Sequence, residues 1–469
     1  MFVVVNTDIL QEECGVVGLW GQEGLDAAEV LYLAMYGVQH RGQQSAGIAI
    51  NDKGRIVYHK ELGLVSEVLN DVVVQHLRGA RAGIADCGYL IASENLRENA
   101  LPLVLRYTKG QMAITYTGSL LNGRELRMEL EKSGFMFQST SDAEVIAQLL
   151  SRERVKCHSI EDALRRVMRQ LVGSYAMLIM TPNKIVAARD PRGMKPLVLG
   201  KLGDAYMFAS ESSAFDTVGA ALVRDVVPGE IAVVDDDGLR SGFIKAEDTA
   251  MCIFEFVYTA RTDSNIDGVN VYDARFEAGK ILAEEYPLDA DIVIGAPDSG
   301  LPAAFGYATA SGIPYAEGFH KNRYIGRTFI QPKQTTRELA VSLKLNSIRS
   351  RIEGKRVILV DDSIVRGTTT KKIVTMMKER DGAKEVHLLI ASPPVKHPCC
   401  YGVDTTNKEA LLANRLSLDE ICKELGADSL GFLSEAGLKR TPIGAKCGFC
   451  YACFDGKYPL DKKGGSDNE

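Results

Sequence analysis

Two patterns of hydrophobic and polar positions divide the chain. From residue 14 to about residue 248, short apolar runs such as 16–20, 112–116 and 175–180 are separated by Gly, Asp and Asn, which predicts strands joined by turns. Helical periodicity interrupts these strands near residues 27–36 and 142–152. We therefore expect this half to be an α+β unit with mostly antiparallel sheets.

After about residue 251, near-continuous apolar strands alternate with helices. The runs at 291–295, 356–360 and 385–390 are apolar almost throughout, which is typical of strands buried on both faces. Helical patterns follow the first two runs. This half is therefore expected to be an α/β domain with a doubly wound parallel sheet.

These patterns predict a division of the chain into two domains and a tail. The predicted domains cover residues 14–248 and 249–460. The polar residues 461–469 are expected to form a flexible tail.

Composition narrows the class of protein. The chain has 469 residues, of which 46% are hydrophobic and 25% charged, as in a folded globular protein. Its net charge of −6 provides no general attraction for nucleic acid or an anionic membrane. No apolar run reaches the ~20 residues that span a bilayer, and the first residues lack the basic segment of a signal peptide. We therefore expect a cytoplasmic protein with no nucleic-acid or membrane partner.

The ten cysteines are unevenly distributed. They are too sparse for a disulfide scaffold, and clustered cysteines in a cytoplasmic chain indicate a metal site or catalysis. The last third of the chain holds most of them: Cys399, Cys400, Cys422, Cys447, Cys450 and Cys453. A set of four thiolates with C-x-x-C spacing suits an iron–sulfur cluster, with a four-cysteine zinc site as the alternative.

The strongest chemical signal is the segment 357–369. A buried strand ends in Asp361 and Asp362, and a short loop then leads through Gly367 into a helix that begins with threonines. Free N–H groups and hydroxyls at such a helix start form an anion site for a phosphomonoester. The paired aspartates suit ribose hydroxyls and Mg²⁺. An ordinary strand–turn–helix with solvated acids is the alternative interpretation.

This segment resembles the phosphoribosyl pyrophosphate (PRPP) signature of type I phosphoribosyltransferases. Residues 295–300 resemble the pyrophosphate loop of that family, and residues 321–332 resemble its mobile catalytic loop. The resemblance implies Mg²⁺ ligands at Ser299, Asp361 and Asp362. It implies PRPP contacts from Asp298, Ser299, Lys321, Arg323, Tyr324, Arg327, Asp361, Asp362, Ser363, Arg366, Gly367, Thr368 and Thr369.

A second resemblance lies near the N-terminus. Cys14-Gly15, followed by the His-Arg-Gly-Gln run at 40–43, resembles the N-terminal-nucleophile glutamine amidotransferases, which have an αββα fold. In that family a leader, here residues 1–13, is removed, and the α-amine of the exposed cysteine activates its thiol. Taken alone, Cys14 would more often be a small buried core residue. The resemblance implies that Cys14 is the nucleophile and that Arg41, Gly42, Gly118 and Asp142 contact glutamine.

The glutamine pocket departs from the family pattern at two positions. The Arg-Tyr-Ser-Thr motif of the family corresponds to residues 88–91, where Tyr89 is kept but Gly88 stands at the position of the arginine that holds the α-carboxylate of glutamine. The His-Asn-Gly oxyanion motif has Thr117 in place of asparagine. Because losing one oxyanion donor costs about 10²–10³ in turnover, we expect weak use of glutamine.

Together the two halves resemble the amidophosphoribosyltransferase family of purine synthesis, over residues 12–460. This implies formation of 5-phosphoribosylamine from PRPP and glutamine, or from PRPP and ammonia, in a homo-oligomer (tetramer or dimer) controlled by purine nucleotides. The chain resembles the subset with a structural [4Fe–4S] cluster. The implied ligands are Cys252, Cys399, Cys450 and Cys453, with Cys447 or Cys400 as substitutes.

Two other functions are compatible with parts of the sequence. One is a PRPP-binding regulator without catalysis, of the kind found among transcription regulators, but a chain of charge −6 lacks the basic DNA-binding module that this requires. The other is an iron–sulfur sensor, which leaves the PRPP loops unexplained. The enzyme is therefore the favoured interpretation.

Overall fold

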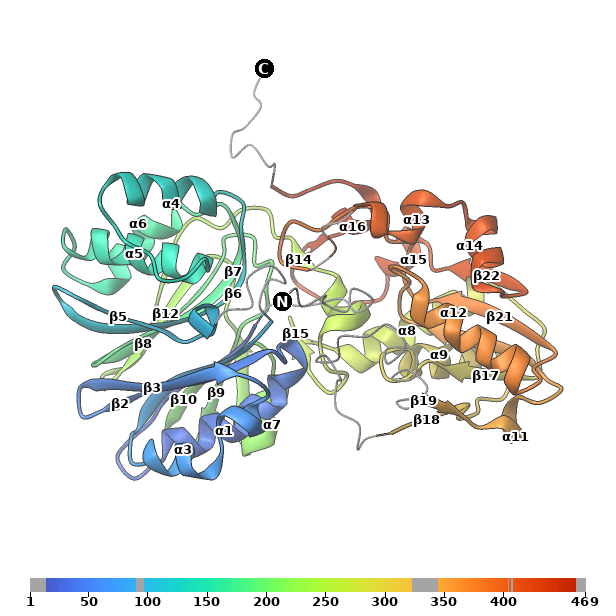
Figure 1. Ribbon diagram of the computed structural model, residues 1–469, viewed down its shortest axis with the longest axis horizontal. Helices are drawn as coiled ribbons and strands as arrows, with labels where there is room; N and C mark the ends of the chain where they lie inside the picture. The colour runs from blue at the N-terminus through green and yellow to red at the C-terminus, as the bar shows by residue number, and fades with distance from the viewer. Residues whose placement is uncertain (1–13, 90–96, 323–344, 404, 406–407, 461–469) are drawn as a thin grey trace, which may run out of the picture.

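The computed structural model describes residues 14–89, 97–322, 345–403, 405 and 408–460. The predicted leader at 1–13 and tail at 461–469 lie outside these residues. Figure 1 shows two lobes side by side, the N-terminal half in blue to green and the C-terminal half in yellow to red. Among the described helices, none has the length and apolar character needed to cross a membrane.

The first lobe contains two stacked antiparallel sheets. The seven-stranded sheet has the order β11-β9-β10-β1-β4-β2-β3, and the six-stranded sheet has the order β13-β12-β8-β7-β6-β5. The strands of the first sheet are β1 (Gly15–Trp20), β2 (Ser45–Asp52), β3 (Arg55–Leu62), β4 (Ala82–Gly88), β9 (Val198–Leu202), β10 (Ala205–Ala209) and β11 (Ala221–Asp225). Those of the second are β5 (Leu103–Tyr107), β6 (Gly110–Leu120), β7 (Gly173–Thr181), β8 (Lys184–Arg189), β12 (Glu230–Asp235) and β13 (Gly238–Phe243).

Helices cover the outer face of each sheet. Alternate strand residues such as Val16, Ile84 and Leu178 form the apolar core between the sheets. The helices on the first sheet include α1 (Ala27–Val38) and α7 (Ser213–Val218), and those on the second are α4 (Gly123–Lys132), α5 (Asp142–Arg154) and α6 (Ile160–Met168). The predicted αββα arrangement is confirmed.

The second lobe is built on a parallel sheet with the order β17-β20-β21-β22. Its strands are β17 (Ile292–Gly295), β20 (Arg356–Asp361), β21 (Glu385–Ile390) and β22 (Ser429–Phe432). Helices α8 (Val271–Glu285) and α9 (Leu301–Ser311) pack on one face, and α12 (Thr368–Thr375) and α14 (Leu418–Leu425) on the other. The predicted doubly wound parallel sheet is therefore confirmed.

The end of the chain returns to the junction between the lobes. The short strand β14 (Met251–Cys252) pairs in parallel with β23 (Phe449–Cys450). The Ser174 hydroxyl of the first lobe donates a hydrogen bond of 2.7 Å to the carbonyl of Tyr401 in the second. The predicted domain boundary at 248/249 lies between β13 and β14.

Candidate active site

Cys14 immediately precedes β1, the central strand of the seven-stranded sheet. Gly15 lies opposite Cys87 of β4, so Cys14 stands beside the end of that strand at Gly88. A β-carbon built on Gly88 would be 2.8 Å from Cys14 Sγ and 3.2 Å from Ser45 Oγ. The thiol and the Ser45 hydroxyl therefore face the space that a side chain at position 88 would enter.

The segment that contains Gly42 packs against the same end of β4. A β-carbon on Gly42 would lie 2.3 Å from the backbone nitrogen of Gly88, so only glycine fits there without a shift. The Gln44 amide donates to the Gly88 carbonyl at 3.0 Å. Gly42 thus lies next to the Cys14 region, while its predicted contact with glutamine stays a prediction.

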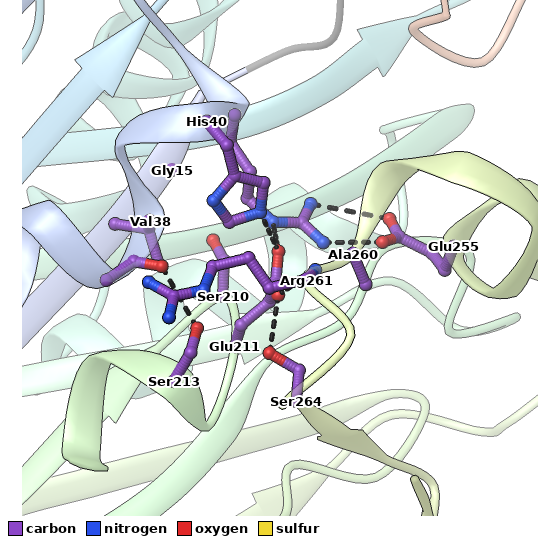
Figure 2. A network of polar contacts seen from close by, with 12 residues as sticks. Gly15, Val38, His40, Ser210, Glu211, Ser213, Glu255, Ala260, Arg261 and Ser264 are labelled. Carbon is purple, nitrogen blue, oxygen red and sulfur yellow. Dashed lines mark hydrogen bonds and ion pairs between the residues drawn. The ribbon is translucent and has the colours of Figure 1, made fainter. Parts of the chain in front are cut away.

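The Arg41 side chain forms buried ion pairs with Glu211 and Glu255, and Figure 2 shows these two glutamates at the junction between the lobes. Its Nε atom donates to Glu211, and its terminal nitrogens donate to Glu255, which begins the short π-helix η3 (Glu255–Thr259) of the second lobe. Arg41 is 2% exposed. Because these guanidinium hydrogens are directed to two protein carboxylates, this geometry provides no support for the glutamine contact predicted for Arg41.

Glu211 is the centre of this cluster. It also interacts with His40 Nε2 at 2.6 Å, and it accepts hydrogen bonds from the Ser264 hydroxyl at 2.6 Å and the Arg261 backbone amide at 2.9 Å (Figure 2). Burial acts to raise the Glu211 pKa, but the charges of Arg41 and His40 and these hydrogen bonds hold it well below its usual range. Local sequence patterns could not reveal this cluster, because its members come from segments that are distant along the chain.

The end of β6 positions the other predicted glutamine contacts. Gly118 has φ +138°, and a β-carbon there would lie 2.0 Å from the Ser174 carbonyl oxygen, so this position requires glycine. Asp142 begins α5 and accepts a hydrogen bond of 2.8 Å from the Leu120 amide. Burial raises the pKa of Asp142 to about 6. Thr117, which replaces the family asparagine, is 1% exposed.

A carboxylate that sequence reasoning missed lies beside Cys14. Asp86 of β4 is 1% exposed. Hydrogen bonding by the Cys14 thiol is among the influences on its pKa. The signal available in the sequence was an acidic residue within the otherwise apolar strand Ala82–Gly88.

The paired aspartates stand at the carboxyl end of β20. The Asp362 amide donates to Asp361 at 2.9 Å, and the Ser363 hydroxyl donates to Asp362 at 2.5 Å. Burial and the neighbouring charge of Asp362 raise the pKa of Asp361 to about 8. Burial raises the pKa of Asp362, and a hydrogen bond from Ser299 acts to lower it. Ser299 and both aspartates therefore form one group of oxygen-bearing side chains.

The loop after β20 leads into α12 with the geometry of an anion site. Gly367 has φ +80° and precedes the first helical residue, Thr368. A β-carbon on Gly367 would lie 2.6 Å from a methyl of Leu412, so the turn also lacks room for a side chain. Among the described residues, the buried Nη1 of Arg366 finds no hydrogen-bond partner. Such a donor beside a helix N-terminus is suited to an anionic ligand.

The predicted pyrophosphate loop lies against this site. It follows β17, and a β-carbon on Gly300 would be 2.8 Å from the Val360 carbonyl oxygen of β20. Lys321, the last residue of β18 (Phe319–Lys321), forms an ion pair with Asp298 of the loop. The predicted contacts Arg323, Tyr324 and Arg327 lie outside the described residues.

Four cysteines line one cavity at the junction of the lobes. They are Cys252, Cys399, Cys450 and Cys453, and the rest of the cavity wall is mainly apolar, with Met194, Phe254 and Tyr401 among its residues. Burial raises the pKa of Cys450 to about 12, with a contribution from the charge of Cys399. Cys400 and Cys447 are not among the lining residues. The Cys447 amide instead donates to Asp267 at 2.7 Å.

The four thiols do not converge on a single point. Within the described part of the chain, no three His, Cys, Asp or Glu side chains approach closely enough to hold one metal ion. A tetrahedral zinc site, with Zn–S distances of about 2.3 Å, needs its sulfurs roughly 3.8 Å apart.

Comparisons with known proteins agree on both halves of the chain. Residues 91–217 match the family model of a glutamine amidotransferase domain, and residues 271–427 match that of a phosphoribosyl transferase domain. The amidophosphoribosyltransferase of Bacillus subtilis is 46% identical over 459 residues, which cover 96% of this chain and 95% of that protein. That of Archaeoglobus fulgidus is also 46% identical, over 96% of this chain and 99% of its own length.

Two solved structures are similar over nearly the whole chain. The glutamine PRPP amidotransferase from B. subtilis, complexed with ADP and GMP, has a TM-score of 0.88 and 44% sequence identity. A structure described as the allosteric regulatory enzyme of purine biosynthesis has a TM-score of 0.90 and the same identity. Each comparison covers 97% of this chain and 98% of the solved chain.

Proposed function

This chain belongs to the amidophosphoribosyltransferase family, whose members form 5-phosphoribosylamine from PRPP and the amide nitrogen of glutamine, and we propose that the site around Asp361 and Asp362 carries the transfer. The supporting observation is that three separate segments meet there. They are the strand end with its paired acids, the Ser299 loop, and the helix start after Arg366. This combination accounts for every charged portion of PRPP.

Each segment has its own role in the proposed site. The N–H groups and hydroxyls at Thr368 and Thr369, together with Arg366, hold the 5′-phosphate. Asp361 and Asp362 bind the ribose hydroxyls. Lys321 neutralises the pyrophosphate as the bond to C1 breaks, and it exchanges its partner Asp298 for the leaving group.

The residues present fit a magnesium ion. Ser299, Asp361 and Asp362 offer oxygen atoms only, which Mg²⁺ prefers. Burial and the neighbouring charge of Asp362 raise the pKa of Asp361 to about 8, and a bound cation would favour the ionised carboxylates. When bound, the ion supplies positive charge that stabilises the departing pyrophosphate.

We propose that ammonia is the better nitrogen donor of this chain. In the glutamine reaction, the Cys14 sulfur attacks the side-chain amide carbon, ammonia leaves as a thioester forms, and water then hydrolyses the thioester to glutamate. The ammonia displaces pyrophosphate from C1 of PRPP. Gly88 offers no cation for the α-carboxylate of glutamine, and Thr117 lacks the amide donor of asparagine. A missing charge-assisted contact costs about 1.5–3 kcal/mol, so glutamine binds weakly while free ammonia bypasses the pocket.

We propose a [4Fe–4S] cluster held by Cys252, Cys399, Cys450 and Cys453. The support is the cavity that these four cysteines line together, with Cys450 and Cys453 at the C-x-x-C spacing that cluster ligands use. A four-cysteine zinc site remains the alternative that metal analysis distinguishes.

Regulation and assembly follow from the family. Because the B. subtilis relative was solved with ADP and GMP, we propose purine nucleotides as effectors of this chain as well. We also propose a homo-oligomer, either a tetramer or a dimer. The expected cytoplasmic location stays a prediction.

The test measures pyrophosphate release from Mg²⁺-PRPP with ammonium and, separately, with glutamine. Asp361→Asn with Asp362→Asn should abolish release with either donor while circular dichroism stays unchanged. Asp273→Asn, an exposed carboxylate on α8, is the matched control and should retain activity. Unchanged release in the double variant would overturn the assignment of this site. No release by the wild type with either donor would favour the PRPP-binding regulator.

A further inference from the structure

Asp86 occupies a core position between the two sheets of the first lobe. Side chains alternate along β4, and Ala82 and Ile84 lie in the apolar cluster between the sheets, beside Val16. Asp86 is the next residue on this face of the strand and is 1% exposed. A carboxyl group in an apolar core is unfavourable unless it has a partner.

The Cys14 thiol is one of the groups that interact with this carboxyl. A β-carbon on Gly88 would stand 2.8 Å from Cys14 Sγ and 3.3 Å from Asp86 Oδ1. The thiol and the carboxyl therefore both border the space that a side chain at position 88 would enter. Glycine leaves this space open to both groups.

Few other polar groups compete for this carboxyl. Among the described residues, neither Asp86 oxygen meets a well-aligned hydrogen-bond partner. The influences on it are the Cys14 thiol, the Lys60 ammonium on β3 and the Tyr116 backbone amide on β6. Lys60 is itself committed to the Ala100 carbonyl, to which it donates at 2.5 Å.

Among the groups that influence Asp86, Lys60 alone carries a positive charge. Burial raises the pKa of Asp86 well above its ordinary value, and the contributions of the thiol, Lys60 and the Tyr116 amide lower it. Cys87, adjacent on β4, faces the other side of the sheet, and burial and the charge of Asp86 raise its pKa. The Ser45 hydroxyl is a neutral neighbour.

We propose that Asp86 is a positioning residue that holds Cys14 as a neutral thiol, so that the nucleophile of this chain is silenced near neutral pH. The inference rests on the proposed function only in taking Cys14 as the amidotransferase nucleophile.

Two adjacent acids influence each other's ionisation. A carboxyl and a thiol in contact lose their protons in two coupled steps. The first proton comes from the carboxyl, which is the stronger acid, so the thiol must lose its proton beside a negative charge. Because only the thiolate is a good nucleophile, a carboxylate at this position suppresses attack on glutamine beyond the effects of Gly88 and Thr117.

The test measures the alkylation rate of Cys14 by iodoacetamide as a function of pH, read by peptide mass spectrometry. The intact mass is determined first, because a leader-free Cys14 carries an α-amine as a second base. Cys157, a partly exposed cysteine elsewhere in the lobe, provides the internal reference, and Cys14→Ser identifies the peptide. This readout requires no turnover, so it is independent of whether the enzymatic proposal holds.

We expect the wild-type midpoint at least one pH unit above the ~8.5 of an ordinary thiol. Asp86→Asn should lower that midpoint by a unit or more and speed alkylation at pH 7.5 about tenfold. Asp52→Asn, at the exposed end of β2, should change nothing. A wild-type midpoint at or below 8.5 would overturn the proposal even if the variant failed to fold, as would an Asp86→Asn profile identical to that of the wild type.

Discussion

The sulfur of Cys14 lies so close to Gly88 that a β-carbon at position 88 would be only 2.8 Å from it. Side chains do not tolerate such a contact, so any residue larger than glycine at this position must displace the thiol. The pocket therefore differs from the family pattern in the position of the thiol as well as in the missing arginine. The thiol has taken a position that an arginine would exclude.

This relationship predicts the result of restoring the family residues. Gly88→Arg with Thr117→Asn should raise glutamine hydrolysis only slightly, because the new guanidinium would pair with Asp86 rather than with glutamine. Adding Asp86→Asn should raise the rate at least tenfold further. Glutamate release from leader-free protein is the measurement.

A control variant separates this effect from a general loss of negative charge. Asp52→Asn in place of Asp86→Asn should leave the rate of the double variant unchanged. If the double variant already hydrolyses glutamine as fast as the triple variant, Asp86 does not compete for the arginine. If wild-type protein hydrolyses glutamine efficiently and Cys14→Ser stops it, other groups supply the contacts assigned to arginine and asparagine.

The ion pairs between the lobes predict a large loss of stability on removing Arg41. Arg41→Met leaves Glu211 and Glu255 buried without their main counter-charge, and breaking a buried pair in this way costs about 3–5 kcal/mol. Chemical unfolding followed by fluorescence should show an earlier transition. Glu255→Gln added to Arg41→Met should recover part of the loss.

The matched control for this prediction is an exposed ion pair. Arg349 and Glu353 are 2.9 Å apart, and both side chains are more than half exposed. Arg349→Met should therefore cost at most about 1 kcal/mol. Equal losses for Arg41→Met and Arg349→Met would contradict a stabilising role for the buried cluster.

The contrast between these sites shows which features a sequence reveals. The strand end and helix start of the proposed PRPP site were predictable because Asp361 to Thr369 are contiguous. The alternation of strands and helices likewise predicted both lobes, since each pattern depends on local periodicity. Arg41 was predicted from its motif, but its partner Glu255 is 214 residues away. Only the fold could reveal that pair.

Asp86 was missed for a related reason. The sequence shows an acid in an apolar strand, but not which face of the sheet receives it or that Cys14 lies beside it. That contact depends on the register of β1 with β4, which places Val16 opposite Asp86. Register is a tertiary property, because a shift of one residue would turn Asp86 to the other face.

The raised pKa of Asp142 predicts two pH dependences. Its pKa of about 6 in the folded protein exceeds the ~3.9 of an unfolded chain, so between these values the folded state retains a proton that the unfolded state has lost. Stability contributed by this group is therefore lost as pH rises from about 4 to 6. Asp142→Asn should reduce the loss seen in urea unfolding at pH 4.5, 5.5 and 6.5.

The second dependence concerns substrate binding. If Asp142 holds the α-ammonium of glutamine, it must be ionised, so the KM for glutamine should fall as pH rises through about 6. The ammonia-dependent reaction should lack this inflection once the concentration of free NH₃ is held constant. A KM that is flat between pH 5 and 7 would remove Asp142 from the glutamine site.

The cysteine cavity predicts the metal content of the protein. Protein purified without oxygen should be brown and contain about four iron atoms per chain. Cys450→Ser should lose the iron, because Cys450 lines the cavity, whereas Cys447→Ser should retain it, because Cys447 does not. The two substitutions make the same chemical change three residues apart, so a difference between them reports position rather than composition.

Iron and zinc analysis with visible absorption decides the outcome. Colourless protein with one zinc per chain would assign the site to zinc, and iron loss in Cys447→Ser would show that the ligand set includes a cysteine outside the cavity.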